Sequence, residues 1–283
     1  MPPCDGLIIG GTNSPDCGIA NLTQLSDFQE VSDRAARTAG AVLLDWAGRF
    51  QVREKGPADL VTEADLASQE IIRETILGAF PRHGFLGEEG GSKPSDDHGY
   101  RWIVDPLDGT TNYVHGIPNY SVSIALEQSG KLLVGTVFDP VSGECFSATA
   151  GGGAFLNGRR LRVSAISRLD QAVVAMSFPP GLTRESPELA EFLQVILLAQ
   201  SMRRYGSSAL NLCFVAAGRF DAYWSSSTKI WDVAAGLLLV EEAGGMVSSR
   251  QGGPLVLDPP HFLTASTPEL HAELSVVLAA HSP

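Results

Sequence analysis

Positive charge is scarce in this sequence. It has 20 Lys and Arg against 32 Asp and Glu, which gives a formal net charge of −12 over 283 residues. Proteins that bind nucleic acid non-specifically need Lys and Arg to displace counterions from phosphates, so the charge argues against that class. The first hypothesis for an acidic enzyme is a cationic substrate.

Cysteine and long apolar runs are also scarce. The four cysteines, Cys4, Cys17, Cys145 and Cys213, show neither CxxC spacing nor histidine partners at zinc-finger distances. A chain of this length folds without disulfides, so a reducing cytoplasm is the expected location. No apolar run reaches the ~20 residues that a membrane span needs, and residues 1–11 lack the basic and apolar stretches of a signal peptide. We therefore expect a cytoplasmic protein with no membrane partner.

The composition that remains is that of an ordinary globular protein. Hydrophobic residues make up 44% and charged residues 18% of the chain, which excludes disorder, collagen and coiled coil. Residues 1–24 are expected to form a flexible lead-in and residues 25–283 a single domain. A change in the pattern of elements divides this domain into subdomains of about 25–169 and 170–283.

Hydrophobic periodicity predicts the elements of these subdomains. Apolar residues at a 3.6-residue period indicate helices over residues 25–50 and 62–80, separated by a Lys-Gly-Pro break, and Thr62 with Asp65 fits a capping pattern. Short strands separated by turns predict an antiparallel meander, and strands then alternate with helices as in an α/β unit. Strands are expected at residues 102–104, 121–127, 132–138, 144–149, 172–177, 220–224 and near Phe262, and later helices at 186–199, 231–243, from 206 and from 268.

Acidic residues mark three segments of the chain. In one, residues 87–91, Glu88 and Glu89 lie in a glycine loop that lets a ligand approach the backbone closely. In another, Asp232 opens an apolar helix. Taken alone, a solvated turn is the better explanation of the first and a helix cap of the second. Asp65 is likewise ambiguous by itself.

The third segment, DPLDGTTN at residues 105–112, begins where a buried strand ends. Its proline and glycine force a sharp turn, so that Asp105 and Asp108 converge while the Leu107 carbonyl points between them. The amides that follow lie where a helix would start, which suits an anion. A turn and a helix cap would account for one Asp and one Thr, but not for the whole run.

Five of the carboxylates offer only oxygen ligands, with no Cys or His near any of them in the sequence: Asp65, Glu88, Asp105, Asp108 and Asp232. That donor set selects Mg²⁺ or Mn²⁺ over zinc. Paired Mg²⁺ ions clamp the attacking and leaving oxygens of a phosphoryl displacement and make a bound water more acidic. A phosphate monoester would be repelled by five carboxylates, so activity is expected to depend absolutely on divalent ions.

The same segments carry a resemblance to a known family. The sequences GEE at residues 87–89, WIVDPLDGTTNYVHGIP at 102–118 and WDVAAG at 231–236, followed by EAGG at 242–245, closely resemble the inositol monophosphatase family. The resemblance runs from about Phe28 to near the C-terminus. It implies an α/β (α+β) fold, a five-layered α/β/α/β/α sandwich shared with fructose bisphosphatases, and a homodimer.

Transferred residue by residue, the resemblance implies metal ligands. Glu88, Asp105 and the Leu107 carbonyl would bind a first, activating Mg²⁺. Asp105, Asp108 and Asp232 would bind a second, and a third, weaker ion would contact Glu88. The implied cofactor is therefore Mg²⁺, with two or three ions in each active site.

The resemblance also implies how water and phosphate are held. Thr110 paired with Asp65 would orient and deprotonate the nucleophilic water, and the amides of Gly109 and Thr110 would receive the phosphate, with Thr111 beside them. Lys55 stands where the family has a basic residue near the metals. The implied catalytic residues are Asp65, Glu88 and Thr110.

The substrate-binding part of the sequence departs from the family pattern. Ser225, next to the bulky Trp224, stands seven residues before Asp232, where many members have a glutamate that accepts hydrogen bonds from substrate hydroxyls. Losing a charge-assisted hydrogen bond costs ~1.5–3 kcal/mol, so a preference for myo-inositol phosphate does not follow. Ser207 and Ser208 match the segment before the substrate-lining helix and either touch the polyol or only cap the helix.

Four further polar residues near these motifs have more modest interpretations. Arg203 and Arg204 are interpreted as surface charges rather than ligands. His115 is interpreted as structural, and Glu89 as a residue that supports the metal ligands from behind.

The implied reaction is Mg²⁺-dependent hydrolysis of a phosphate monoester by direct attack of water, without a phosphoenzyme. Inositol 1-phosphate is the leading substrate. Histidinol phosphate, 3′-phosphoadenosine phosphate and a sugar phosphate or fructose bisphosphate are alternatives with the same chemistry. A role in binding a macromolecule is a further alternative, because some bacterial relatives have one. The expected partner is a small phosphorylated metabolite, and no nucleic acid is required.

Overall fold

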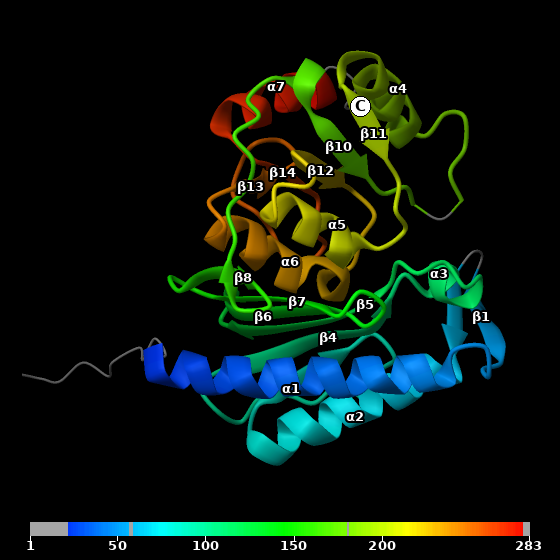
Figure 1. Cartoon of the computed structure of the whole chain (residues 1–283), viewed down its shortest axis with the longest axis vertical. Coiled ribbons are helices and arrows are strands. Elements are labelled where there is room, and N and C mark those ends of the chain that lie inside the picture. The colour runs from blue at the N-terminus through cyan, green and yellow to red at the C-terminus, as the bar shows by residue number, and fades with distance from the viewer. Residues whose placement is uncertain (1–21, 57–58, 180, 280–283) are drawn as a thin grey trace, which may run out of the picture.

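The computed structural model describes residues 22–56, 59–179 and 181–279. Within them, helices and sheets stack in five layers (Figure 1), which confirms the expected α/β/α/β/α sandwich. Two helices cover the outer face of a large sheet, two lie between the sheets, and two cover the outer face of a smaller sheet. In that order the pairs are α1 (Leu22–Trp46) with α2 (Glu63–Ala79), α5 (Ser208–Ala216) with α6 (Ile230–Glu242), and α4 (Pro187–Leu198) with α7 (Pro268–Ala279).

The large sheet has seven strands within the described residues, in the order β3-β4-β5-β6-β7-β8-β9. All neighbours pair antiparallel except β3 and β4, so the predicted meander is confirmed and extends at both ends. The strands are β3 (Gly84–Gly87), β4 (Tyr100–Asp108), β5 (Ser121–Gln128), β6 (Lys131–Asp139), β7 (Glu144–Thr149), β8 (Gly153–Leu156) and β9 (Arg159–Arg160). A short helix, α3 (Thr110–Val114), follows β4.

The smaller sheet is mixed, with the order β11-β10-β12-β14-β13 in the part of the chain that the structure describes. Strand β10 runs parallel to both of its neighbours, and β14 runs antiparallel to both of its own. The strands are β10 (Val173–Met176), β11 (Ser201–Arg203), β12 (Ala222–Ser225), β13 (Met246–Ser249) and β14 (Phe262–Ala265), with a 3₁₀ turn at Leu169–Gln171 before β10.

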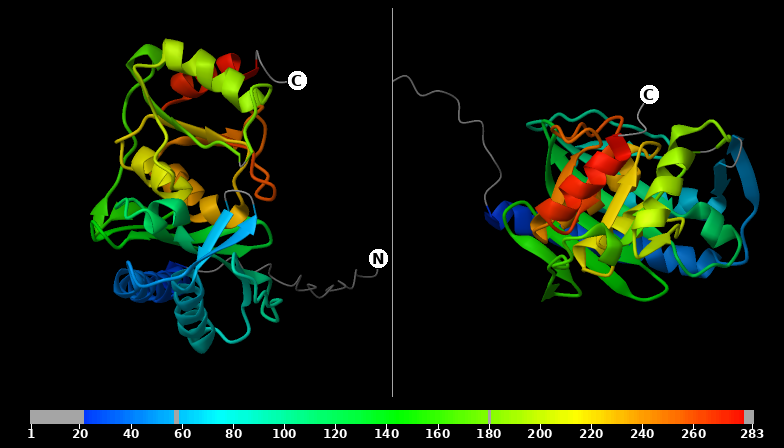
Figure 2. Two further views of the ribbon diagram at one scale, coloured as in Figure 1. Left: turned by 90° about the vertical axis from the view of Figure 1, so that its right-hand side faces the viewer. Right: turned by 90° about the horizontal axis from the view of Figure 1, so that it is seen from above.

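Figure 2 shows the layers from two further directions. Within the described residues, three apolar clusters fill the spaces between these layers. Phe28 on α1 packs among aromatic rings that include Trp102 of the large sheet. Leu212 and Val233 belong to the middle cluster, to which both sheets contribute, and Leu270 belongs to the outer one. Because the middle cluster joins residues from both halves of the chain, the two halves pack as one body.

The structure moves some predicted boundaries. Helix α1 spans Leu22–Trp46 rather than residues 25–50, so its first turn occupies positions expected in the lead-in, and residues 1–21 lie outside the described part. The Lys-Gly-Pro break belongs to a region with two paired strands, β1 (Val52–Gly56) and β2 (Asp59–Thr62), which the sequence analysis missed. No helix among the described residues has the length and apolarity to cross a bilayer.

Candidate active site

A bulge in β4 explains how two acidic side chains three residues apart can share one site. On a regular strand, residues i and i+3 point to opposite faces of the sheet. Here Asp105 pairs with Ser123 and Asp108 with Ser121, so three steps on β4 oppose two steps on β5. The extra residue changes the side from which the later carboxylate projects. The strand was expected to end before Asp105 in a sharp turn, and this prediction was wrong: β4 continues to Asp108, and the bulge inside it does what the turn was expected to do.

Glu88 reaches this strand end through the parallel pairing of β3 and β4. The Glu88 amide donates to the Val104 carbonyl at 3.1 Å, immediately before Asp105. Gln69 of α2 holds the glycine loop by accepting from the Glu89 amide at 2.9 Å and donating to the Gly90 carbonyl at 3.2 Å. The loop is therefore tied to two layers of the fold, and Glu89 is part of this support through its backbone.

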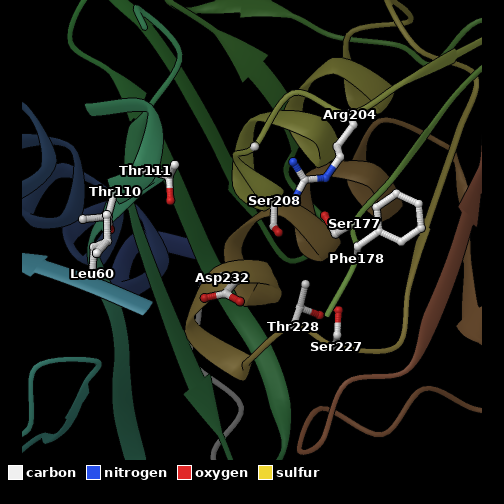
Figure 3. Close-up of a pocket in the computed structure, with 12 residues that line it drawn as sticks. Leu60, Thr110, Thr111, Ser177, Phe178, Arg204, Ser208, Ser227, Thr228 and Asp232 are labelled. Atoms are coloured by element: carbon white, nitrogen blue, oxygen red, sulfur yellow. The ribbon is translucent and has the colours of Figure 1, made fainter. Parts of the chain in front are cut away.

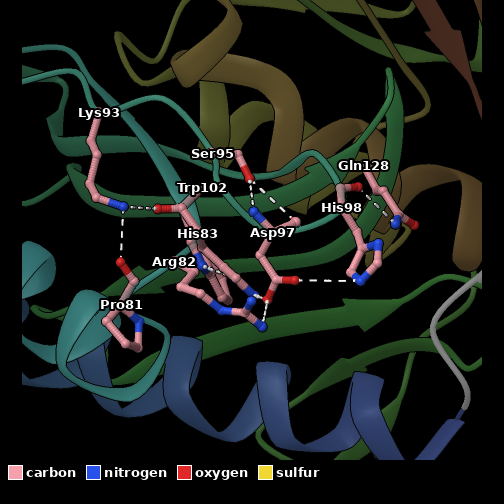
Figure 4. A network of polar contacts seen from close by, with 9 residues as sticks. All are labelled: Pro81, Arg82, His83, Lys93, Ser95, Asp97, His98, Trp102 and Gln128. Carbon is pink, nitrogen blue, oxygen red and sulfur yellow. Dashed lines mark hydrogen bonds and ion pairs between the residues drawn. The ribbon is translucent and has the colours of Figure 1, made fainter.

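A polar network joins the residues before β3 to Lys93, which follows the glycine loop, and to β4 (Figure 4). The Trp102 indole donates to Nδ1 of the buried His83 at 3.0 Å, and the Lys93 ammonium donates to the Pro81 and His83 carbonyls at 2.9 Å. Because an indole only donates, His83 must keep Nδ1 unprotonated. Burial is the main cause that lowers the pKa of His83, to about 4. The Asp97 carboxylate opposes that shift.

Asp108 is held by the start of α5. Its Oδ2 accepts from the Ser207 hydroxyl and from the Ala209 amide at 2.8 Å, and its Oδ1 accepts from the Ser208 amide at 3.1 Å. Ser207 also caps its own helix by accepting from the Leu210 amide. A carboxylate is favourable there because the free amides of a helix start carry partial positive charge.

Asp232 lies in the first turn of α6, where its carboxylate accepts from the Lys229 amide at 2.8 Å. The helix packs closely on the large sheet, since a Cβ on Gly135 would come within 2.8 Å of the Ala235 carbonyl oxygen. The Ser123 hydroxyl, opposite Asp105 on β5, donates to the Trp231 carbonyl at 3.2 Å. These contacts bring the start of α6 over the end of β4.

The four carboxylates act on one another electrostatically. Burial raises the pKa of Asp105 well above its usual range, and the charges of Glu88, Asp108 and Asp232 raise it further. Burial, followed by the charge of Asp108, raises the pKa of Asp232 to about 8. Burial also raises the pKa of Asp108 to about 6, against the lowering effect of its hydrogen bonds to α5. A full set of negative charges is therefore unfavourable here without cations.

The donor set fits a hard cation. It consists of oxygen atoms only, and its charges repel one another, which a divalent ion would relieve. Among the residues described, no three His, Cys, Asp or Glu side chains are already arranged around an ion position. Instead, the carboxylates of Asp105, Asp108 and Asp232 each accept a hydrogen bond from a backbone amide.

The short helix α3 follows these carboxylates. Gly109 precedes it at φ +95°, where a Cβ would come within 3.1 Å of the Asn119 carbonyl oxygen, so the position requires glycine. The Thr110 hydroxyl donates to the Leu107 carbonyl at 3.1 Å. Asp65 is buried at the start of α2, and its Oδ2 accepts from both the amide and the hydroxyl of Thr62, which confirms the predicted capping box.

A pocket of ≈ 260 Å³ opens beside α3 (Figure 3). The figure shows Leu60, Thr110 and Thr111 on one side, Arg204 and Ser208 on the other, and Asp232 between them. Its remaining lining residues are Gly109, Ser177, Phe178, Gly206, Ser227 and Thr228. Glu88 and Glu89 instead line a neighbouring pocket with Thr62 and Leu66.

The structure places only some of the predicted substrate-binding residues at the pocket. Thr111 and Ser208 line the pocket, whereas Ser207 and Ser225 are each 1% exposed and do not. Ser207 acts on Asp108, and the Ser225 hydroxyl accepts from the Ser227 amide at 3.3 Å. The side chain of Lys55 lies outside the described part of the structure.

Sequence reasoning missed several lining residues. Arg204, interpreted as a surface charge, lies at the pocket, and Ser177, Phe178, Ser227 and Thr228 were not singled out as ligands. Arg204 stands two residues before Gly206, which precedes α5. This closeness to a segment expected near the substrate was the signal that could have identified it. The others follow the ends of β10 and β12, and only the pairing of these strands shows that they meet.

Comparison with known proteins agrees with this fold. The family model described as the inositol monophosphatase family matches residues 24–282. An inositol-1-monophosphatase of Rhizobium meliloti is 48% identical over 72% of this chain and 77% of its own. The Nus factor SuhB of Pseudomonas aeruginosa is 41% identical over 86% of this chain and 93% of its own.

Solved structures of relatives have the same architecture. The extragenic suppressor protein suhB from Bartonella henselae superposes with a TM-score of 0.85 at 42% identity, covering 89% of this chain and 98% of that one. Inositol monophosphatase from an Anabaena species gives 0.82 at 39% identity, covering 92% and 98%.

The layered fold is that of solved inositol monophosphatases, and the protein is an enzyme of the phosphatase class. The chain belongs to the inositol monophosphatase family. Members of this family are generally metal-dependent.

Proposed function

We propose that the protein hydrolyses phosphate monoesters with Mg²⁺, inositol 1-phosphate among them. The observation that carries this proposal is the convergence of four mutually repelling carboxylates on the end of β4, beside the start of α3. Relatives named inositol-1-monophosphatase support the choice of substrate.

Glu88, Asp105, the Leu107 carbonyl, Asp108 and Asp232 would hold two or three Mg²⁺ ions. The ions supply positive charge for the phosphate and make a bound water more acidic. Burial of these ligands strengthens that effect, because electrostatic interactions are less screened away from water. Ser207 and the α5 amides keep Asp108 in place, and Lys229 keeps Asp232 in place.

Thr110 and Asp65 would orient the attacking water and take its proton. Both come from rigid elements, since Asp65 is fixed by the capping box of α2 and Thr110 by its bond to the Leu107 carbonyl. The amides of Gly109 and Thr110, with Thr111 beside them, would receive the phosphate oxygens. Direct attack by water leaves no covalent enzyme intermediate, so no nucleophilic Ser or Cys is needed.

The test is phosphate release from inositol 1-phosphate by protein stripped with chelator, before and after Mg²⁺ is restored. We expect no turnover without divalent ions and full recovery with them. Stripped protein that kept its rate would contradict the proposal.

A second function is favoured by the relatives named Nus factor SuhB. In that case the chain would act mainly by binding a macromolecule. Asp105→Asn separates the two, because it removes a charge from the proposed metal site and leaves the surface unchanged. A cellular phenotype that disappears with Asp105→Asn favours the enzyme, and one that persists favours the binding role.

A further inference from the structure

Among the described residues that line the pocket, the wall opposite α3 carries one cation, Arg204, and no acid. We propose that Arg204, with the hydroxyls of Ser208 and Thr228, forms a second anion-binding subsite. The preferred substrates are then phosphate monoesters that carry a second oxyanion, either another phosphate or a carboxylate. This inference rests on the proposed phosphatase activity and concerns the part of the substrate beyond the ester.

The backbone next to Arg204 is fixed against residues 112–119, in and after α3. The Tyr205 carbonyl accepts from the Asn112 side-chain amide at 2.8 Å and from that of Asn119 at 3.0 Å. Gly206 lies so close to Asn112 that a Cβ at Gly206 would come within 2.9 Å of its Nδ2. Arg204 is therefore held at a set position relative to α3, where the ester phosphate is proposed to bind.

The guanidinium of Arg204 is oriented toward the pocket. Its central carbon lies 5.8 Å from the centre of the Phe178 ring, and both side chains line the pocket (Figure 3). Such cation–π contact orients the group and leaves its N–H donors available. In the part of the chain that the structure describes, no carboxylate forms an ion pair with Arg204.

Hydroxyl groups complete this wall. The Thr228 side chain is 8% exposed, and its Oγ1 has no hydrogen-bond partner among the described residues although it lines the pocket. A buried polar atom without a partner is costly, so this hydroxyl is suited to bind a ligand. Ser177 is held by the Tyr223 hydroxyl at 2.7 Å and supports the same wall.

The position of Ser225 removes the feature that would oppose an anion. Ser225 stands where the resemblance to the family implies a glutamate, and it is a buried serine that does not line the pocket. A glutamate would repel a second oxyanion, whereas Arg204 attracts one. Charge-assisted hydrogen bonds are roughly twice as strong as neutral ones, so this wall favours an oxyanion over a neutral hydroxyl.

The experiment measures kcat/KM for two matched substrate pairs with Mg²⁺ present. One pair is fructose 1,6-bisphosphate and fructose 1-phosphate, and the other is 6-phosphogluconate and glucose 6-phosphate. The first pair tests a second phosphate and the second pair tests a carboxylate. The variants are Arg204→Ala and Arg204→Gln, with Arg203→Ala as control. Arg203 carries the same charge one residue away, but its guanidinium bonds Ser201 and the Met202 carbonyl.

We expect the wild-type protein to prefer the two-anion member of at least one pair. Both Arg204 variants should lower that preference by about tenfold or more, mainly through KM, while Arg203→Ala leaves it unchanged. An absent preference, or an equal loss in the Arg203 variant, would overturn the subsite. Absence of Mg²⁺-dependent turnover on every substrate would overturn the proposed function itself.

Discussion

The two walls of the pocket are built in different ways. The wall at α3 and α6 follows a bulged strand and two helix starts, and the carboxylates next to it are held by hydrogen bonds to the backbone, such as those of Asp108 to α5. The opposite wall comes from loops after β10, β11 and β12, and it includes the exposed side chain of Arg204.

This difference separates chemistry from specificity. Groups that hold ions must be fixed closely, which buried strand and helix ends provide. Groups that select the rest of the substrate can vary on loops without disturbing the fold. Variants of the first wall should therefore abolish turnover, whereas variants of the second should change substrate preference.

Among variants of the first wall and its ligands, Asp105→Asn should lower turnover the most. It keeps the side chain's shape but removes a charge from the proposed ion site, so kcat is expected to fall by about 10³-fold or more. Its melting temperature in chelator should not fall, because the lost charge is one that its neighbours repel. Asp170→Asn, at a fully exposed carboxylate, is the matched control. Retention of a tenth of the activity would contradict the assignment.

Mg²⁺ should stabilise the protein more at pH 8 than at pH 5. The pKa of Asp232 is raised to about 8 and that of Asp108 to about 6. A carboxyl with a raised folded-state pKa contributes stability below its unfolded-state value of about 4, and this contribution is lost as pH rises through the folded-state value. The melting temperature in chelator should therefore fall between pH 4 and pH 8.

Binding of Mg²⁺ requires the ionised carboxylates, so its effect should grow over the same range. At a hundred times the dissociation constant it adds about 2.7 kcal/mol to the free energy of unfolding. Calorimetric melting with chelator and with Mg²⁺ at several pH values measures both trends. A Mg²⁺ effect that is independent of pH would contradict the account.

Ser207→Ala tests whether the helix start positions an ion ligand. The substitution removes a hydroxyl that donates to Asp108 and also caps α5. We therefore expect a loss of about 1 kcal/mol in the free energy of unfolding and a several-fold weaker apparent Mg²⁺ affinity. Ser207→Thr should restore both. Ser186→Ala, at the start of α4, is the control and should leave the Mg²⁺ affinity unchanged. Equal Mg²⁺ affinity in Ser207→Ala and wild type would reject this role.

The smallest effect on turnover is expected at His83, which lies away from both walls and acts on stability instead. Its folded-state pKa is lowered to about 4, so it contributes stability above pH 6.5 that is lost as pH falls toward 4. Allowing for solvent screening, this loss is about 1–2 kcal/mol. His83→Gln should make the free energy of unfolding less dependent on pH between 6.5 and 4, and substitution of the exposed His98 by Gln should not. Unfolding in denaturant at several pH values measures this dependence. Identical curves for both variants would count against the proposed role of His83.

The sequence predicted the first wall better than the second. The 3.6-residue period located most helices, and the DPLDGTTN segment identified two of the four acidic residues that the structure brings together. The period of side chains does not reveal the bulge that places Asp105 and Asp108 on one site, because strand register depends on the partner strand.

The second wall could not be predicted in the same way. Arg204 and Thr228 come from separate loops, and only the order of strands in the smaller sheet brings them to one pocket. Ser225 was expected in the pocket from its position relative to Asp232, but in the structure it is buried in β12. Residues on loops carry no periodic signal, so their neighbours follow from the tertiary fold alone.

The central claim is that the carboxylates at the end of β4 form a divalent-cation site. An anomalous difference map from a crystal soaked in Mn²⁺ tests it most directly. We predict at least one peak about 2.1 Å from a carboxylate oxygen of Asp105, with a second between Asp108 and Asp232. A well-ordered map with no peak at these carboxylates would contradict the account.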